Sequence, residues 1–173
     1  MKKGDLRKKK GFTIIEVSLV LAIAGLIFLM VFVALPQLQR QQRDSRRRDD
    51  ILSFLETVKK YQTNNRGALP VGESGAAEYG KAGTTEKNRW QDFYNDYLGD
   101  SFVDPDGTHY KLVISKCNSS SGCRKALNSM DHNIYVYKQA TCKDSETVVK
   151  ASNPRTVAVM YRLEGSGMYC ENT

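Results

Sequence analysis

The sequence predicts an α+β protein in which one long N-terminal helix packs on a small antiparallel sheet of three or four strands. Three observations support this fold class. A largely apolar run, residues 12–35, continues into a segment with helical periodicity at 51–61. Later stretches alternate apolar and polar residues with the period of a strand. Four cysteines all lie in the second half of the chain, where they can tie the C-terminal region. We expect a helix over 12–64 and a globular head over 65–173.

The apolar run contains one charged residue, Glu16. At 1.5 Å per residue its helix reaches about 36 Å, enough to cross a bilayer core of about 30 Å. A carboxylate in hydrocarbon costs roughly 2.5–3.5 kcal/mol, so Glu16 needs a partner or a place near the headgroups. An ordinary secretory signal is an alternative, because Ala22-Ile23-Ala24 fits the small-residue cleavage pattern. Cleavage there would leave an apolar N-terminus, Gly25–Leu35.

Positive charge flanks the apolar run. Residues 1–11 carry a net charge of +5 and residues 40–48 carry +4, whereas residues 49–173 carry −1. A nucleic-acid-binding domain would carry its basic charge on the folded part, so we predict no specific nucleic-acid partner. Basic residues beside an apolar span instead influence its orientation in the membrane, and here the positive charges of the two flanks are nearly equal.

The junction Lys8-Lys9-Lys10-Gly11 followed by Phe12-Thr13-Ile14-Ile15-Glu16 resembles the type IV prepilin motif. The resemblance extends to about residue 65. It implies that a membrane peptidase removes the basic leader, residues 1–11, after Gly11, and that the new N-terminal residue, Phe12, is N-methylated. It also implies that the Phe12 amine of one subunit neutralises Glu16 of a neighbour, which would fix the axial offset between subunits. The alternative for Glu16 is that it reaches the headgroups from near the end of the span.

The resemblance implies a structural subunit of a type IV pilus. Before assembly it would cross the cytoplasmic membrane once with its N-terminus inside, and afterwards it would lie in a surface filament used for adhesion, motility or DNA uptake. Its partners would be further copies of itself, the prepilin peptidase and the assembly machinery in the membrane. A pseudopilin of a type II secretion or competence system has the same N-terminal chemistry. A single-pass anchored extracellular binding protein is the alternative from another class. We find no enzyme motif, and we expect no cofactor and no metal.

Two residues weaken the helix near the apolar run. Gly25 lowers helix propensity by about 1 kcal/mol relative to alanine, and Pro36 lacks an amide donor. In type IV pilins, which this motif resembles, the stretch between a glycine and a proline at about these places can unwind in the filament. The alternative is that Gly25 permits close helix packing and Pro36 gives a fixed kink.

The rest of the helix has two parts. Residues 37–50 lack an apolar stripe, and the spacings Arg40–Asp44, Arg46–Asp50 and Arg46–Asp49 predict a solvated face with its own ion pairs. Neighbouring subunits or lipid headgroups are alternative partners for these charges. An apolar face then returns at helical spacing. Its members are Ile51, Leu52, Phe54, Leu55, Val58 and Tyr61. Gly67 is suited to a positive φ at the end of the helix.

The head begins with a loop-like region, 65–108, in which Glu86–Leu98 is predicted to be helical with an aromatic core-facing stripe. Strands are expected at Tyr110–Ser115, Ile134–Gln139 and Thr156–Leu163, with a short edge strand at Gly167–Cys170. The connections show no clear crossover helix, so we predict antiparallel pairing.

The cysteines occupy positions 117, 123, 142 and 170. Their intervals do not fit paired zinc ligands, and an even number in an exported chain favours disulfides. We favour Cys117–Cys123 with Cys142–Cys170. The second link is supported by the resemblance, since many pilins fasten their C-terminal region with such a disulfide. The other two pairings remain open.

A few polar residues invite further interpretations. Asp104-Pro105-Asp106-Gly107 predicts a turn, and its two carboxylates are a weak signal for calcium. His109 and His132 are expected to be ordinary surface residues. Asn118 begins a short glycosylation sequon.

Overall fold

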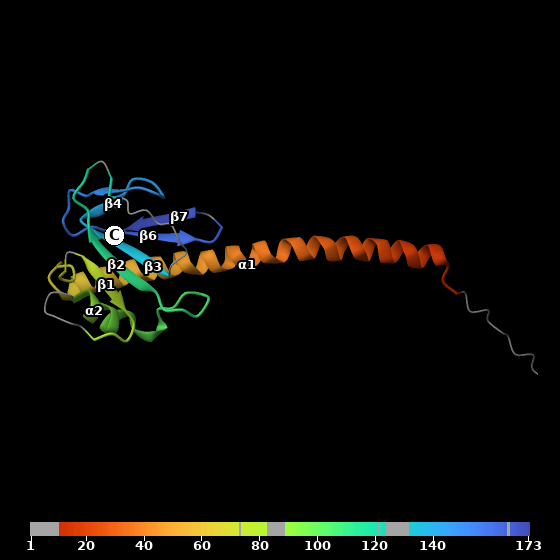
Figure 1. The fold of residues 1–173 in the computed structure, drawn as a ribbon, viewed down its shortest axis with the longest axis horizontal. Helices are drawn as coiled ribbons and strands as arrows, with labels where there is room; N and C mark the ends of the chain where they lie inside the picture. The colour runs from red at the N-terminus through yellow and green to blue at the C-terminus, as the bar shows by residue number, and fades with distance from the viewer. Residues whose placement is uncertain (1–10, 73, 83–88, 121, 124–131, 166) are drawn as a thin grey trace, which may run out of the picture. The chain divides into compact units, whose positions relative to one another are not determined.

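The computed structural model describes residues 11–72, 74–82, 89–120, 122–123, 132–165 and 167–173. The chain forms two compact units, Met1–Gln39 and Arg40–Thr173. Helix α1 (Ile14–Asn64) belongs to both (Figure 1). The long helix predicted from the sequence is therefore present, and it begins at Ile14 rather than at Phe12.

The C-terminal unit, Arg40–Thr173, contains a five-stranded sheet with the order β1-β2-β3-β6-β7 (Figure 1). Its strands are β1 (Gly75–Glu78), β2 (Lys111–Lys116), β3 (Asn133–Lys138), β6 (Val157–Leu163) and β7 (Gly167–Asn172). A separate pair joins β4 (Ala140–Cys142) to β5 (Val148–Lys150). The four expected strands correspond to β2, β3, β6 and β7. The other three strands were not predicted.

The expectation of an entirely antiparallel sheet is wrong at one pair. Strands β2 and β3 are parallel, with Leu112 opposite Ile134 and Ile114 opposite Val136. The pairs β1–β2, β3–β6 and β6–β7 are antiparallel. A parallel crossover needs a connection of about a dozen residues or more. The connection 117–132 is that long, although its sequence has no helical pattern.

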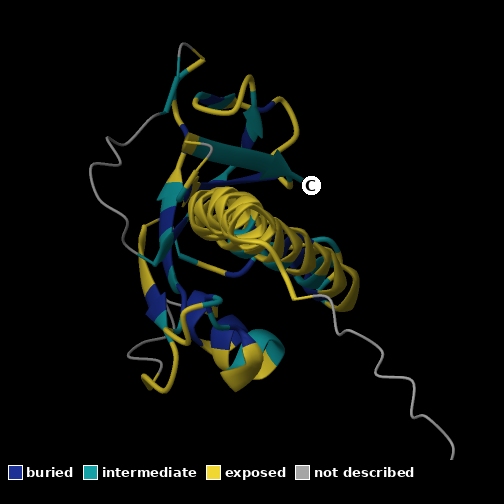
Figure 2. Cartoon of the chain, turned by 90° about the vertical axis from the view of Figure 1, so that its right-hand side faces the viewer, coloured by how far each residue is buried: buried dark blue, intermediate teal, exposed yellow. Residues whose placement is uncertain are grey.

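One face of the sheet packs on the second half of α1 (Figure 2). On the helix, Ile51, Phe54, Leu55, Val58 and Tyr61 are buried, as the periodicity predicted. Leu52 is the exception, with 43% of its surface exposed. Because successive helical residues are about 100° apart, Leu52 falls beside the stripe that begins at Ile51.

The strands supply the other half of this core. The members that share it with the helix are Leu112, Ile114, Ile134, Val136, Val157, Val159, Tyr161 and Leu163. The alternating residues Ala158 and Met160 are also buried, in a second cluster with Val148 of β5. Strand β6 is thus covered on both faces, which explains its nearly continuous apolar sequence.

The aromatic segment is a core element, as predicted. Its described part is α2 (Arg89–Phe93), followed by a π-helical turn, η1 (Tyr94–Leu98), and a 3₁₀ turn, η2 (Gly99–Ser101). Trp90, Phe93 and Tyr94 are buried, and the Tyr94 hydroxyl donates to the Tyr110 carbonyl at 2.7 Å. The first residues of the expected helix, Glu86–Asn88, lie outside the described residues.

Helix α1 ends in a tight turn that uses two residues of positive φ, Arg66 at 56° and Gly67 at 81°. The Gly67 N–H donates to the Gln62 carbonyl at 2.6 Å, which is the long-range bond of a Schellman motif. The sequence predicted the role of Gly67, but Arg66 also takes the left-handed conformation.

Candidate functional site

The start of α1 is a reciprocal capping box formed by Thr13 and Glu16. The Glu16 carboxylate oxygen Oε2 accepts hydrogen bonds from the Thr13 N–H at 3.1 Å and from the Thr13 hydroxyl at 3.0 Å. In return, the Glu16 N–H donates to the Thr13 hydroxyl oxygen at 3.3 Å. Threonine followed three residues later by glutamate is a known helix-start pattern, and it is visible in the sequence. The cap explains why the helix begins at Ile14.

This cap also determines where the Glu16 carboxylate lies. It is held over the backbone amide of Thr13, one peptide bond away from Phe12. Phe12 itself is 87% exposed. The three sequence-predicted residues Gly11, Phe12 and Glu16 are therefore clustered at one accessible helix end.

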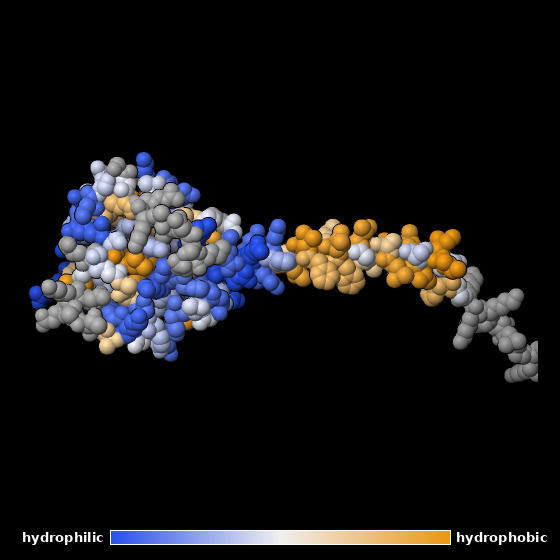
Figure 3. Space-filling model, in the orientation of Figure 1, coloured by the Kyte–Doolittle hydropathy of each residue, from blue (hydrophilic) through white to orange (hydrophobic). Residues whose placement is uncertain are grey.

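The apolar half of α1 is exposed along its length. The most apolar 18-residue window has a mean hydropathy of 2.9, and none of it is buried. Figure 3 shows this segment as an almost uninterrupted apolar surface, followed by a strongly hydrophilic band. Burying a large apolar side chain stabilises a protein by about 1.5–3 kcal/mol relative to exposing it. A surface of this kind indicates membrane anchoring or cover by other protein.

Gly25 and Pro36 lie within the continuous helix. The assignment of α1 runs through Pro36 without interruption. A Cβ at Gly25 would meet no atom of this chain within 4 Å, so its backbone is open to close approach by another helix. Unwinding between the two residues and close packing at Gly25 both remain proposals.

The polar segment of α1, residues 37–50, contributes to a buried ionic cluster centred on Arg47. The Arg47 guanidinium donates to both carboxylate oxygens of Asp104, from Nε at 2.7 Å and from Nη2 at 2.8 Å. Its Nη1 donates to Asp44 at 3.2 Å and to Glu164 at 2.7 Å. Bidentate pairing of this kind is the strongest geometry available to arginine. The Asp104 carboxylate holds the pKa of Arg47 above its ordinary value, in opposition to burial.

Asp44 and Arg43 extend the cluster to the turn between β6 and β7. The Asp44 carboxylate accepts the N–H groups of Glu164 at 2.9 Å and of Gly165 at 2.8 Å. Arg43 donates to the Glu164 carboxylate through Nε at 3.0 Å and Nη2 at 2.6 Å. Arg43, together with Arg47, lowers the pKa of Glu164 to about 2.

Two tyrosines complete the cluster from the sheet side. The Tyr161 hydroxyl donates to Asp104 at 2.9 Å, and the Tyr110 hydroxyl donates to Asp50 at 2.9 Å. Burial raises the pKa of both tyrosines and of Asp50. These contacts therefore join one helix to the 104–107 turn, to Tyr110 just before β2, to strand β6 and to the β6–β7 turn.

The prediction of a solvated, self-paired face over 37–50 is wrong for this part of the helix. Asp44 and Arg47 are only 4% and 5% exposed. Among the described residues, the ion pairs of this segment that leave the helix go to Asp104 and Glu164. The partners are far away in the sequence, so spacing along the helix could not reveal them.

The carboxylates of the possible calcium site are bound by other groups of the protein. Asp104 forms a turn with Gly107, as predicted, but its carboxylate is engaged by Arg47, by Tyr161 and by the Asp106 N–H at 3.1 Å. Asp106 lies 2.5 Å from His132 Nε2. Asp104, Asp106 and His132 offer three ligand atoms close together, too few for the six to eight oxygens that calcium prefers.

Both histidines make specific contacts, whereas the sequence analysis expected ordinary surface residues. His132 pairs with Asp106, and the His109 ring stacks on Tyr79 with centroids 4.1 Å apart. Both are partly buried. Asn118, the first residue of the sequon, is exposed.

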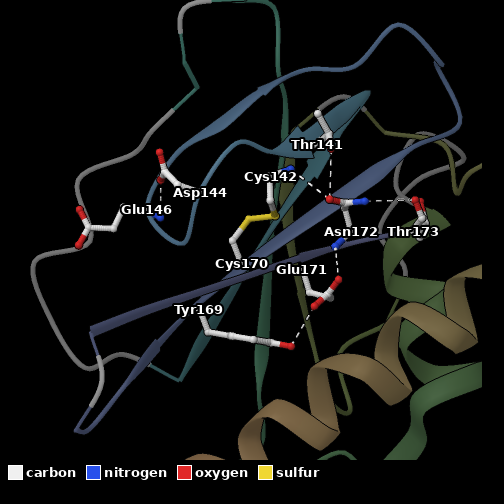
Figure 4. Close-up of a disulfide and its surroundings, with 9 residues drawn as sticks. All are labelled: Thr141, Cys142, Asp144, Glu146, Tyr169, Cys170, Glu171, Asn172 and Thr173. Atoms are coloured by element: carbon white, nitrogen blue, oxygen red, sulfur yellow. Dashed lines mark hydrogen bonds between the residues drawn. A yellow bond between two sulfur atoms is a disulfide. The ribbon is translucent and has the colours of Figure 1, made fainter.

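The four cysteines form two disulfides, Cys117–Cys123 and Cys142–Cys170. This is the pairing favoured from the sequence. Cys142–Cys170 joins β4 to β7 (Figure 4). Beside it, the Asn172 side-chain oxygen accepts from the Thr141 hydroxyl and the Cys142 N–H, both at 3.2 Å. The C-terminal strand is therefore fixed both covalently and by hydrogen bonds.

Comparison with known proteins identifies a family motif in the N-terminal segment. A family model described as the prokaryotic N-terminal methylation motif matches residues 6–32. The search of curated proteins and the search of solved structures each found no match. The matched range contains Gly11, Phe12, Glu16 and Gly25, and it ends inside the exposed apolar half of α1.

The motif indicates the kind of protein to which the N-terminal segment is similar. The chain carries the signal of type IV pilin-like and prepilin-like proteins, and its fold is a long N-terminal helix with an antiparallel-rich, disulfide-tied α+β unit. Proteins with this motif are structural rather than enzymatic. In its N-terminal segment the chain is therefore similar to pilin-like and pseudopilin-like proteins, and the motif with its apolar helix indicates membrane anchoring.

Proposed function

We propose that this protein is the precursor of a type IV pilus subunit, cleaved after Gly11 and polymerised through the apolar half of α1. The observation that carries the proposal is the conjunction of the methylation motif with a long helix whose apolar first half is exposed. In the membrane, lipid would cover this surface. In a filament, the same surface of other subunits would replace the lipid.

Cleavage after Gly11 would convert the Phe12 amide nitrogen into a charged amine, which methylation leaves basic. The mature chain would then have a cation at its first residue and its only apolar-segment anion at Glu16. In the precursor the Glu16 carboxylate is accessible and bonded only to Thr13 among the described residues. A neighbour's amine can therefore reach it without breaking a salt bridge.

The energetic argument favours an intermolecular pair. An unpaired carboxylate in hydrocarbon costs roughly 2.5–3.5 kcal/mol, and opposite charges attract far more strongly there than in water. Subunits that align the amine with Glu16 avoid this cost, whereas other axial offsets do not. The charge pair would thus select one offset among many that bury similar apolar area.

Replacing Glu16 tests this function. Glu16→Gln removes the charge but keeps a side chain that can complete the capping box, whereas Glu16→Ala removes both. We expect both variants to be inserted, cleaved and folded, and both to give little sheared surface filament compared with wild type. The measurement is filament against membrane-bound subunit, with the mature mass determined in each case.

Four outcomes would contradict parts of the proposal. Normal filament yield from Glu16→Gln would refute charge pairing as the basis of assembly. Loss of cleavage would show that the peptidase reads Glu16. A wild-type chain that stays full length and never assembles would favour the anchored binding protein instead. Filaments confined to a secretion or competence apparatus would identify a pseudopilin.

A further inference from the structure

A basic hollow lies at the C-terminal end of α1, in the Arg40–Thr173 unit. Its volume is about 590 Å³, within the range of small-molecule sites. It is lined by Lys59, Gln62, Thr63, Arg66, Gly67, Asn153, Arg155, Thr156 and Thr173. Three of these side chains are cationic and none is acidic. The ionic cluster around Arg47 takes no part in it.

The fold holds the three cations together from three different segments. Lys59 belongs to the last turns of α1, Arg66 to the positive-φ turn after it, and Arg155 to the turn before β6. Gln62 Nε2 donates to the Arg155 carbonyl at 2.8 Å, and the Arg155 N–H donates to Asn153 Oδ1 at 2.9 Å. These bonds tie the β6 turn to the helix end.

Gly67 lets the Arg155 side chain enter the hollow. A Cβ at Gly67 would lie 2.8 Å from Arg155 Nη1 and 2.9 Å from Cζ. The guanidinium is therefore seated against the Gly67 backbone, where any larger residue would displace it. The position of this cation is set by packing rather than by a carboxylate.

The three cations are not paired with a side-chain carboxylate in the part of the chain that the structure describes. Among the described residues, Lys59, Arg66 and Arg155 form no ion pair with a carboxylate, in contrast to Arg43 and Arg47. The partial negative charge of a helix C-terminus favours cations nearby, but it corresponds to only about half a unit charge. A net excess of positive charge remains over an accessible concave surface.

We propose that this hollow binds an oxyanion ligand with at least two negative charges, of the phosphate type. Arginine forks match tetrahedral oxyanions geometrically, and lysine supplies a mobile point charge. The hydroxyl of Thr156 and the side-chain NH₂ of Asn153 are further donors on its wall. The proposal does not depend on filament assembly. A free phosphate compound and phosphate groups on a polymer share this chemistry.

The test is titration calorimetry of the full chain in an uncharged detergent at low ionic strength. Pyrophosphate probes a free ligand, and a short linear polyphosphate probes a polymer. Lys59→Gln and Arg155→Gln each remove one cation from the hollow. Lys60→Gln is the matched control, since Lys60 is the exposed neighbour on the same helix and does not line the hollow. Arg155→Gln retains the backbone carbonyl that Gln62 uses.

We expect saturable binding of at least one probe, weakened about 15-fold by Lys59→Gln and by Arg155→Gln, which is the effect of removing one cation about 5 Å from two negative charges in water. Lys60→Gln should leave the affinity within twofold. The probe that shows this dependence identifies the ligand as free or polymer-borne. Absence of saturable binding of either probe would overturn the proposal. So would an equal loss in Lys60→Gln, because it would reduce the effect to general surface charge.

Discussion

Arg47 is the side chain whose loss should damage the C-terminal unit most selectively. Its side chain is 6% exposed and donates four hydrogen bonds to three carboxylates, those of Asp44, Asp104 and Glu164. Arg47→Met keeps an unbranched side chain that suits a helix, but it removes every one of those donors. Glu164 retains Arg43. Asp104, which is fully buried, loses its only cation among the described residues.

The expected loss in the free energy of unfolding follows from leaving a buried charge without its partner. Such changes cost about 3–5 kcal/mol, because the remaining carboxylate is neither solvated nor neutralised. The Tyr161 hydroxyl and the Asp106 N–H still donate to Asp104, so we expect the lower part of this range. For a folded unit of this size, that loss corresponds to a decrease in Tm of about 10–15 °C.

Thermal and urea unfolding of the full chain in detergent measures the effect. Trp90 is the chain's single tryptophan and is fully buried, so its fluorescence reports unfolding of the C-terminal unit. Arg46→Met is the matched control, because Arg46 is the exposed neighbour, and it should change stability by no more than about 0.5 kcal/mol. Equal Tm values for Arg47→Met and Arg46→Met would refute the assignment of the cluster as a structural anchor of the helix.

Three further changes have expected outcomes. Removing the Cys142–Cys170 disulfide should cost about 3.5 kcal/mol in urea unfolding and removing Cys117–Cys123 about 2 kcal/mol, because the closed loops differ in length; equal costs would contradict the loop-entropy argument. The lowered pKa of Glu164 stabilises the fold above the unfolded carboxyl pKa of about 4.3, and this contribution of about 2 kcal/mol should disappear as the pH falls towards 2. Asp50, whose pKa burial raises, acts in the opposite direction, so the comparison is with Glu164→Gln, which should show a smaller loss in acid; an unchanged acid profile would argue against the pair. Thr13→Ala should destabilise the first turn of α1 by about 1 kcal/mol, seen as roughly fivefold faster amide exchange at residues 16–18, whose N–H groups are the first that are hydrogen-bonded, and unchanged exchange would contradict the capping box.

The sequence was most informative where one element carries its own pattern. The apolar run, the stripe from Ile51 to Tyr61 and the alternation in Thr156–Leu163 each depend on residues close in the chain, and all three are present in the structure. Strand β1 was missed because Gly75-Ala76-Ala77-Glu78 has no β-branched or aromatic residue. Its pairing comes from β2 rather than from its own propensity.

Features that depend on distant partners could not be predicted. The charges around Arg47 fit a solvated helix face by composition, and only Asp104 and Glu164, which are 57 and 117 residues away, make them buried. The parallel β2–β3 pair depends on a long connection without helical periodicity. The capping box of Thr13 and Glu16 differs, since its signal was visible in the sequence.

The N-terminus of the exported protein tests the central claim most directly. If the chain is a processed filament subunit, intact-mass measurement of protein sheared from the cell surface should give a chain beginning at Phe12 with one added methyl group. The same material should appear as filaments. A chain beginning at Gly25, or a full-length chain retained in the membrane, would contradict the account, because neither has an amine at Phe12 that Glu16 of a neighbour could bind.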